Sequence, residues 1–360
     1  MRYIAQGLRR DTALHIACLS KHQYYHRPVG NKSSGRPRSE TTLHKGVHVA
    51  NRQVIEVIRQ VQRDPDTNYG YRRMYYHLMQ MGYQINHKKV YRLMKGADLL
   101  KKKVRPRSQK SYVKYRIVTP ERPLQVLEMD IKMVWVTEQR RHAYILTILD
   151  TFTRMALYWC VGYCMKEHQV KQAWCYLIEH YLQAYNLLNE QLHVELRNDN
   201  GPQFSSNLIQ SFMKENHIDQ VFTHPYTPQE NGHVESFHSI LKEALGQQPF
   251  WSLIELEDRL KVFYQKYNNV RIHSAIAHLA PHTFWQCWQQ DLIERIELKN
   301  KKVKFKLKIP YQQLSGNESL RVVLCSNEPS LNGEDYLNYQ QEVIGANTSI
   351  LQPRGGPSSV

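Results

Sequence analysis

The sequence predicts an α/β domain, a mixed sheet flanked by helices, preceded by a small all-α domain. Three observations support this fold class. Strand and helix patterns alternate from about residue 121 onward, three short helices with tight turns come before them, and the excess positive charge lies in the first third of the chain. The 360 residues are enough for two or three domains with at least one sizeable core.

The positive charge is strongly localised. Residues 1–120 contain 26 Lys or Arg against 6 Asp or Glu, whereas the other 240 residues contain 23 against 26. Such a block favours a polyanionic partner, usually nucleic acid, although a solvated basic tail is an alternative. The chain shows no apolar run of membrane-spanning length and no apolar signal-peptide core. We therefore expect a cytoplasmic, nucleoid-associated protein without a membrane partner.

Residues 1–100 are expected to hold a helical segment (1–27), a flexible basic linker (28–50) and a helix-turn-helix domain (51–100). In that domain, Val54 and Ile58 repeat at helical spacing, Asp64-Pro65-Asp66 ends the first helix, and Asn86 is a plausible cap of the third. The third helix would face DNA, unless the unit is a generic bundle with a charged face. The expected DNA contacts here and in the basic linker 101–120 are Arg72, Arg73, Lys88, Lys89, Arg92, Lys101, Lys102 and Lys103.

The catalytic core is predicted over residues 121–290. Its strands are expected at 124–136, 144–149, 156–161, 192–197 and 220–222, and its helices at 169–188, 205–216 and 230–245, with further helices at 252–290. This order is that of an RNase H-like fold. Residues 291–360 are expected to be a partly disordered extension, with one alternating strand pattern at 302–309.

Three carboxylates are candidates for metal-dependent phosphoryl transfer, which needs oxygen ligands converging from rigid elements. Asp130 lies among apolar residues of the first strand, Asp199 follows the fourth strand, and Glu235 lies on the next helix. Each of them alone could be structural, as a buried carboxylate, a turn former or a surface helix residue. Lys242 lies two helical turns beyond Glu235 on the same face, where it could hold a DNA phosphate.

Several motifs resemble one known family. Asp199 and Glu235 have the spacing of retroviral-type integrases and related bacterial transposases. Residues 198–204 (NDNGPQF) and 225–237 (PYTPQENGHVESF) resemble the two signatures around these carboxylates. Residues 267–273 (YNNVRIH) resemble a downstream box, and residues 69–73 and 90–94 resemble the helix-turn-helix. Over roughly residues 14–285 the chain is similar to the second-reading-frame (OrfB) product of insertion-sequence-three transposases.

This resemblance implies a DNA transposase or integrase that cleaves and joins insertion-sequence ends with two divalent ions, Mg²⁺ or Mn²⁺. It implies Asp130, Asp199 and Glu235 as catalytic metal ligands. The residues it marks as supporting are Asn200, Gly201, Asn231, Arg271 and His273. It also implies element-end and target DNA, a homo-oligomer on DNA, and a first-frame (OrfA) protein or fusion as partners.

The chain departs from the family pattern at Lys132, which strand alternation places on the same face as Asp130. A cation so close to the first carboxylate leaves room for a catalytically weak or inactive DNA-binding relative. A nuclease of the same fold that cuts without joining is another alternative, because the fold and the carboxylates do not separate it from a transposase.

Overall fold

The computed structural model describes residues 6–21, 24, 39–101, 119–188, 193–223, 231–246, 249–298 and 302–316. Residues 1–40 and 41–360 form two separate units. The first unit contains α2 (Arg10–Ile16), a helix with one buried residue, Leu14. Within the described ranges, no helix has both the length and the apolar character that a membrane crossing requires.

The helix-turn-helix segment consists of α4 (Asn51–Arg63), the short η1 (Pro65–Thr67), α5 (Tyr71–Gln80) and α6 (His87–Gly96). The apolar faces of the three longer helices form one core because their apolar residues recur every three or four positions. Its fully buried members include Val54, Ile58, Met74, Leu78, Val90 and Met94. Asn86 caps α6, as predicted, by accepting a hydrogen bond of 2.8 Å from the Lys88 amide.

Residues 41–50 form a β-hairpin, so the prediction of a flexible linker over 28–50 is wrong for this part. Strand β1 (Thr41–His44) pairs with β2 (Val47–Ala50) and with β3 (Tyr83–Gln84), which gives the sheet order β2-β1-β3. Lys45 and Gly46 adopt the positive φ values that a two-residue hairpin turn requires. The pairing with β3 spans about forty residues, so local composition gave no sign of it. Residues 28–38 of the predicted linker lie outside the described residues.

The core domain contains a five-stranded mixed sheet of order β6-β5-β4-β7-β8. Its strands are β4 (Val126–Val136), β5 (Arg141–Asp150), β6 (Ala156–Gly162), β7 (Val194–Asn198) and β8 (Ile218–Phe222). The first three are antiparallel, and β7 and β8 run parallel to β4. The strand and helix order confirms the predicted RNase H-like α/β class.

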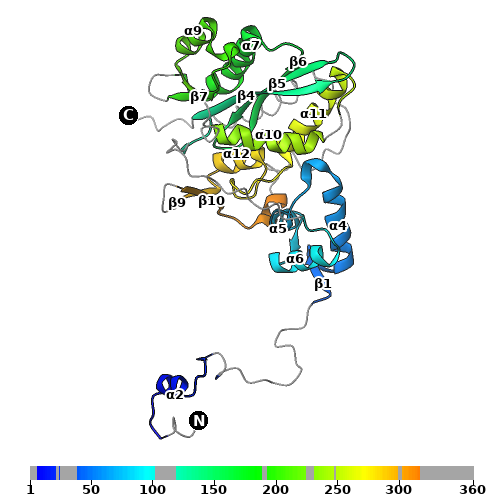
Figure 1. Ribbon diagram of the computed structural model, residues 1–360, viewed down its shortest axis with the longest axis vertical. Helices are drawn as coiled ribbons and strands as arrows, with labels where there is room; N and C mark the ends of the chain where they lie inside the picture. Colours follow the sequence, from blue (N-terminus) through cyan, green and yellow to red (C-terminus); the bar gives the residue numbers. More distant parts are fainter. Residues whose placement is uncertain are drawn as a thin grey trace, which may run out of the picture. The chain divides into compact units, whose positions relative to one another are not determined.

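Helices cover both faces of the sheet (Figure 1). One face packs against α7 (Glu167–Leu177), its continuation η2 (Ile178–Gln183), the short α8 (Pro202–Ser205) and α9 (Asn207–Glu215). The other packs against α10 (Gly232–Leu245) and α11 (Leu253–Asn269). Side chains alternate along β4, so Leu127 and Met129 face α7 while Val134 and Val136 face the α10–α11 side. Glu128, Asp130 and Lys132 share the latter side, as predicted for Lys132.

The core was predicted to end at residue 290, but residues beyond it also pack against the core. Helix α12 (Pro281–Gln289) leads into the hairpin of β9 (Ile293–Leu298) and β10 (Lys302–Leu307), followed by η4 (Tyr311–Gly316). Ile293, Leu307 and Leu314 are buried against Phe152 and Phe284 of the core. The strand predicted at 302–309 is confirmed, and the first part of the extension belongs to the folded unit. Residues 317–360 lie outside the described residues.

Candidate active site

Two acidic side chains of β4 lie under helix α10. Asp130 has a side chain 27% exposed, and its Oδ2 lies 3.3 Å from Nδ1 of His238 on α10. Glu128, two residues earlier on the same face of the strand, is completely buried. A buried carboxylate is costly unless partners satisfy its oxygens, so the contacts of Glu128 indicate its role.

Glu128 fastens the first turn of α10 to the sheet. Its carboxylate accepts hydrogen bonds from the backbone amides of His233 (3.0 Å) and Val234 (2.7 Å), and it lies 2.7 Å from Nδ1 of His233. These amides belong to the helix start, where backbone N–H groups have no partner within the helix. Burial raises the pKa of Glu128 to about 7, against the Val234 hydrogen bond and the charges of Arg154 and Arg197.

Glu235 lies on the exposed part of α10, one residue after Val234. Burial, then the negative charges of Asp130 and Glu128, raise its pKa, while the neighbouring His238 lowers it. Three carboxylates on β4 and α10 therefore lie close together, with His233 and His238 beside them. Carboxylates grouped on rigid elements mark a candidate cation site.

Asp199 follows β7 directly and is exposed. The β4–β7 register pairs Glu128 with Arg197, so two residues further Asp130 and Asp199 come level on neighbouring parallel strands. The Gly201 amide donates to Asp199 Oδ1 at 3.0 Å, and the Asn200 side chain donates to the Thr223 carbonyl at the end of β8. The two predicted supporting residues thus shape the Asp199 turn.

The carboxylates do not all converge. Asp130 and Glu235 interact, but within the described ranges no group of three His, Cys, Asp or Glu side chains is arranged to hold a metal ion. Residues 224–230, between β8 and α10, lie outside the described part of the chain. Asn231, the predicted supporting residue that precedes α10, is buried.

Arg271 and His273 occupy a different place, the junction between the helix-turn-helix segment and the core. Arg271 donates to the Asp66 carbonyl in η1, and the next residue, Ile272, donates its amide to the Tyr69 hydroxyl at 3.1 Å. Burial and nearby arginines, Arg271 first, hold the pKa of His273 well below its usual range. Arg271 therefore joins the helix-turn-helix segment to the core, and His273 follows it by two residues in the same loop.

The same junction contains two ion pairs. Asp66, with a side chain 3% exposed, lies 2.7 Å from Arg259 of α11, and Asp64 lies 2.7 Å from Lys266 of the same helix. Arg259 also donates to the Ala244 carbonyl in the last turn of α10. The Asp64-Pro65-Asp66 turn, predicted only to end a helix, therefore also docks the helix-turn-helix segment.

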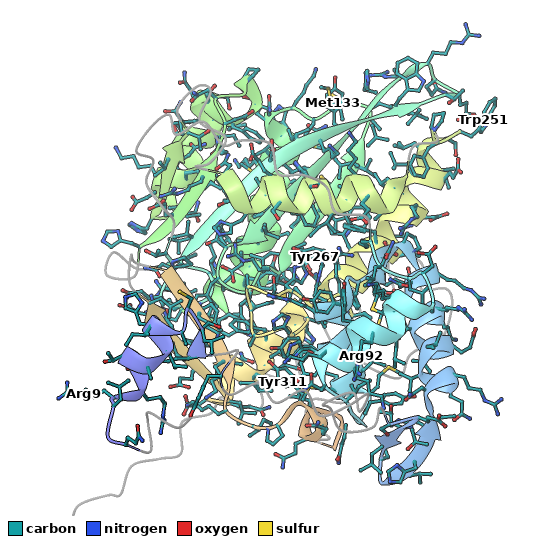
Figure 2. All side chains as sticks on the ribbon, turned by 60° about the horizontal axis from the view of Figure 1, so that its bottom comes forward. Arg9, Arg92, Met133, Trp251, Tyr267 and Tyr311 are labelled. Carbon is teal, nitrogen blue, oxygen red and sulfur yellow. The ribbon has the colours of Figure 1, made fainter. Side chains whose placement is uncertain are left out.

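The predicted DNA contacts fall into three groups. The first group has exposed side chains: Lys88 and Arg92 on α6, and Lys242 on α10. Arg92 is labelled in Figure 2. Side chains engaged within the protein are those of Lys89, which donates to the Thr41 carbonyl at 2.6 Å, and Lys101, which pairs with Glu243 at 2.9 Å. Arg72 is exposed and Arg73 half-buried at the start of α5. Lys102 and Lys103 lie outside the described residues.

Sequence reasoning missed three residues at the site: Glu128, His233 and His238. Local signals existed for two of them. Glu128 precedes Asp130 by two positions, hence lies on the same strand face, and His238 follows Glu235 by three, hence lies on the same helix face. His233 had no such signal, because its partner Glu128 is 105 residues away.

Comparisons with known proteins support this architecture. Residues 120–228 and 216–281 match families described as integrase core domain, and residues 49–107 match an HTH-like domain. InsK, assigned as transposase to insertion sequence element IS150 of Escherichia coli, is 30% identical over 62% of this chain and 80% of its own. A 39.2 kDa protein of insertion element IS476 of Xanthomonas euvesicatoria is 26% identical over 77% of this chain and 72% of its own.

Among solved structures, the catalytic core domain of BIV integrase is 20% identical over 47% of this chain and 97% of its own. Its TM-score of 0.33 is too low for an argument from superposition, so the fold assignment relies on the strand order and register. An RNase H-like sheet, acidic residues on β4 and α10, the integrase-core and HTH-like matches and the relationship to InsK agree with one another. The chain belongs to the family of insertion-sequence transposases that carry an HTH-like domain before an integrase core domain.

Proposed function

We propose that this transposase cleaves and joins DNA ends at Asp130, Asp199 and Glu235, with two divalent ions, Mg²⁺ or Mn²⁺. The observation that carries the proposal is the placement of Asp130 and Glu235 on two rigid elements, β4 and α10, that are held against each other. His238 of α10 lies 3.3 Å from Asp130, and Glu128 accepts hydrogen bonds from the first turn of the same helix. Burial, then the charges of Asp130 and Glu128, raises the pKa of Glu235.

The donor set fits hard divalent cations. Carboxylate oxygens are the ligands that Mg²⁺ prefers, and Asp130 and Glu235 present them from a strand and a helix. When bound, two ions would stabilise both the attacking and the leaving oxygen of an in-line displacement at phosphorus. Asp199 would join the other two carboxylates as a ligand from the neighbouring strand end.

The protein's own groups do the positioning. His238 contacts Asp130 and limits the orientation of that carboxylate. Glu128 fixes the start of α10, and the helix then carries Glu235 and, two turns later, the exposed Lys242. Lys242 would hold a phosphate of the DNA strand close to the carboxylates, and Lys88 and Arg92 would contact the duplex from α6.

The direct test is cleavage and joining of labelled linear DNA that flanks the gene, in Mg²⁺ or Mn²⁺. The wild type is compared with Asp130→Asn, Asp199→Asn and Glu235→Gln. Glu215→Gln, an exposed carboxylate change on α9, is the matched control. We expect the wild type and the control to cut and join, and the three site variants to lose both activities.

Other outcomes separate the alternatives. Cutting without joining would indicate the nuclease, and salt-sensitive binding that persists in Asp199→Asn without any cutting would indicate a binding protein. Persistent activity in one site variant would show that this carboxylate is not part of the active site. Joining two ends needs two active sites, so we also propose a homo-oligomer on DNA. If the wild type is inert alone, adding a first-frame protein tests whether that partner is required.

A further inference from the structure

A groove separates the helix-turn-helix segment from the core on one side of the junction. Its volume is about 660 Å³. It is bordered by the start of α5, the start of α6, Lys101 in the segment after α6, and the loop after α11. The lining residues are Gly70, Tyr71, Arg72, Arg73, Tyr75, Tyr76, His87, Lys101, Ser274 and His278.

The groove is positively charged. Its lining contains two arginines and one lysine and no acidic residue. Lys101 is oriented by Glu243, at 2.9 Å. Burial, then the neighbouring Arg271, lowers the pKa of Arg73. The charge of Glu243, which lies outside the groove lining, partly offsets this effect on Arg73, and Arg72 is exposed.

One wall of the groove is aromatic. The Tyr76 ring stacks on His278, with centroids 3.6 Å apart, and Tyr75 meets both Tyr76 and His87 edge-on. Tyr71 lies edge-on to Tyr91, and its hydroxyl accepts a hydrogen bond from Arg72. These ring contacts hold the side chains in place, so a flat ligand would meet a preformed surface at little entropic cost.

The volume of the groove determines whether it can bind duplex or unpaired nucleic acid. Its volume is in the range of sites that enclose a small molecule, so a double helix cannot enter it. Proteins that bind unpaired strands usually combine cationic side chains along the phosphate backbone with aromatic rings that stack on the bases. The exposed Lys88 and Arg92 of α6 remain available for duplex DNA.

We propose that this groove binds an unpaired end of the DNA strand, with phosphate on Arg72 and Arg73 and bases against Tyr71 and Tyr75. The inference deepens the proposed function, because it takes DNA as the ligand and specifies its form. Duplex DNA lies on α6, and a strand that has separated from its complement enters the groove.

The test measures binding by fluorescence anisotropy in the full chain carrying Glu235→Gln, without divalent metal. The probes are a blunt duplex and the same duplex with a short single-stranded overhang. We expect the overhang to bind more tightly by about fivefold or more, the scale of one stacked base. Arg72→Ala and Tyr71→Leu should each abolish this preference, and Tyr71→Phe should retain it.

Arg92→Ala is the matched control, because it removes an exposed arginine outside the groove. It should weaken binding of both probes equally and leave the preference intact. Equal binding of the two probes by the parent chain, or a preference that survives both Arg72→Ala and Tyr71→Leu, would overturn the proposal, as would failure to bind either probe. Since no cleavage is measured, a wrong assignment of the carboxylates would not change the result.

Discussion

The two ends of helix α10 are each held by a buried carboxylate, but their charge environments differ. At the start, Glu128 contacts His233 and two backbone amides, and further carboxylates lie close by. At the end, Asp66 pairs with Arg259, which also bonds the Ala244 carbonyl. At the second end the charges are paired, and this end forms the joint between the helix-turn-helix segment and the core. The first brings Glu128, Asp130 and Glu235 close enough for their charges to influence one another.

The difference separates stability from activity along one helix. Fully paired carboxylates contribute to the stability of the fold, and the protein loses stability when one of them is removed. Carboxylates that repel one another lower stability and are kept for the ligand they bind. Substitutions at the two ends should therefore have different consequences, and the expected effects on stability can be ranked.

The largest effect is expected at the joint. Asp66→Ala would leave Arg259 and Lys266 without their buried partner, and breaking such a pair typically costs about 3–5 kcal/mol of unfolding free energy. Urea unfolding measures it. Asp64→Ala is the matched control, because its pair with Lys266 is partly exposed and should cost about 1 kcal/mol or less. Equal losses in the two variants would contradict the assigned role of Asp66.

A smaller effect is expected at the start of α10. Glu128→Ala removes the acceptor of the His233 and Val234 amides, and unsatisfied buried groups cost about 1–3 kcal/mol. Glu128→Gln retains one acceptor oxygen and should lose less. The matching readout is hydrogen exchange of the first turn of α10, which should accelerate more in Glu128→Ala. Unchanged exchange in both variants would show that the helix start is held by other contacts.

Acid should weaken the joint. Burial, then Arg73 and Lys304, lowers the pKa of His278 to about 4, and burial and arginines lower that of His273 further below its usual value. The unfolded chain then binds more protons than the folded one, so stability falls as pH drops from about 6.5 toward 4. Urea unfolding at several pH values measures this slope. His278→Gln should flatten it, whereas changing the exposed His142 should not.

The smallest effect on stability, with the opposite sign, is expected for Glu235→Gln. Neutralising this side chain relieves its repulsion by Asp130 and Glu128, so the melting temperature should stay the same or rise slightly. Activity should nevertheless fall by about 10³-fold, the scale of losing an electrostatic catalytic group. A marked loss of stability would mean that Glu235 is structural, and the comparison between the two ends of α10 would fail.

The fold and the transposase family could be predicted because their signals are local. Alternating apolar residues set the strands, helical spacing set the helices, and the motifs around Asp199 and Glu235 lie within short stretches of chain. The predicted class, the strand order and the transposase family are confirmed. The assignment of Asp130, Asp199 and Glu235 as metal ligands stays a prediction.

Several features could not be read from local sequence because they depend on partners far away in the chain. The hairpin at 41–50 pairs with β3, and the Lys89 amine contacts Thr41 instead of being free for DNA. Arg271 is charged and belongs to a motif of the family, yet its guanidinium donates to a carbonyl 205 residues earlier. A basic or polar residue is compatible with several partners, and only packing selects one of them.

By itself, the sequence determined which segments become strands and helices, and which family they resemble, because these properties depend on neighbours along the chain. The tertiary structure decided which polar residues meet. It placed Glu128 beneath α10, Asp66 against Arg259, and tyrosines and arginines around one groove. Burial makes these contacts strong or costly, and burial is a property of the folded chain.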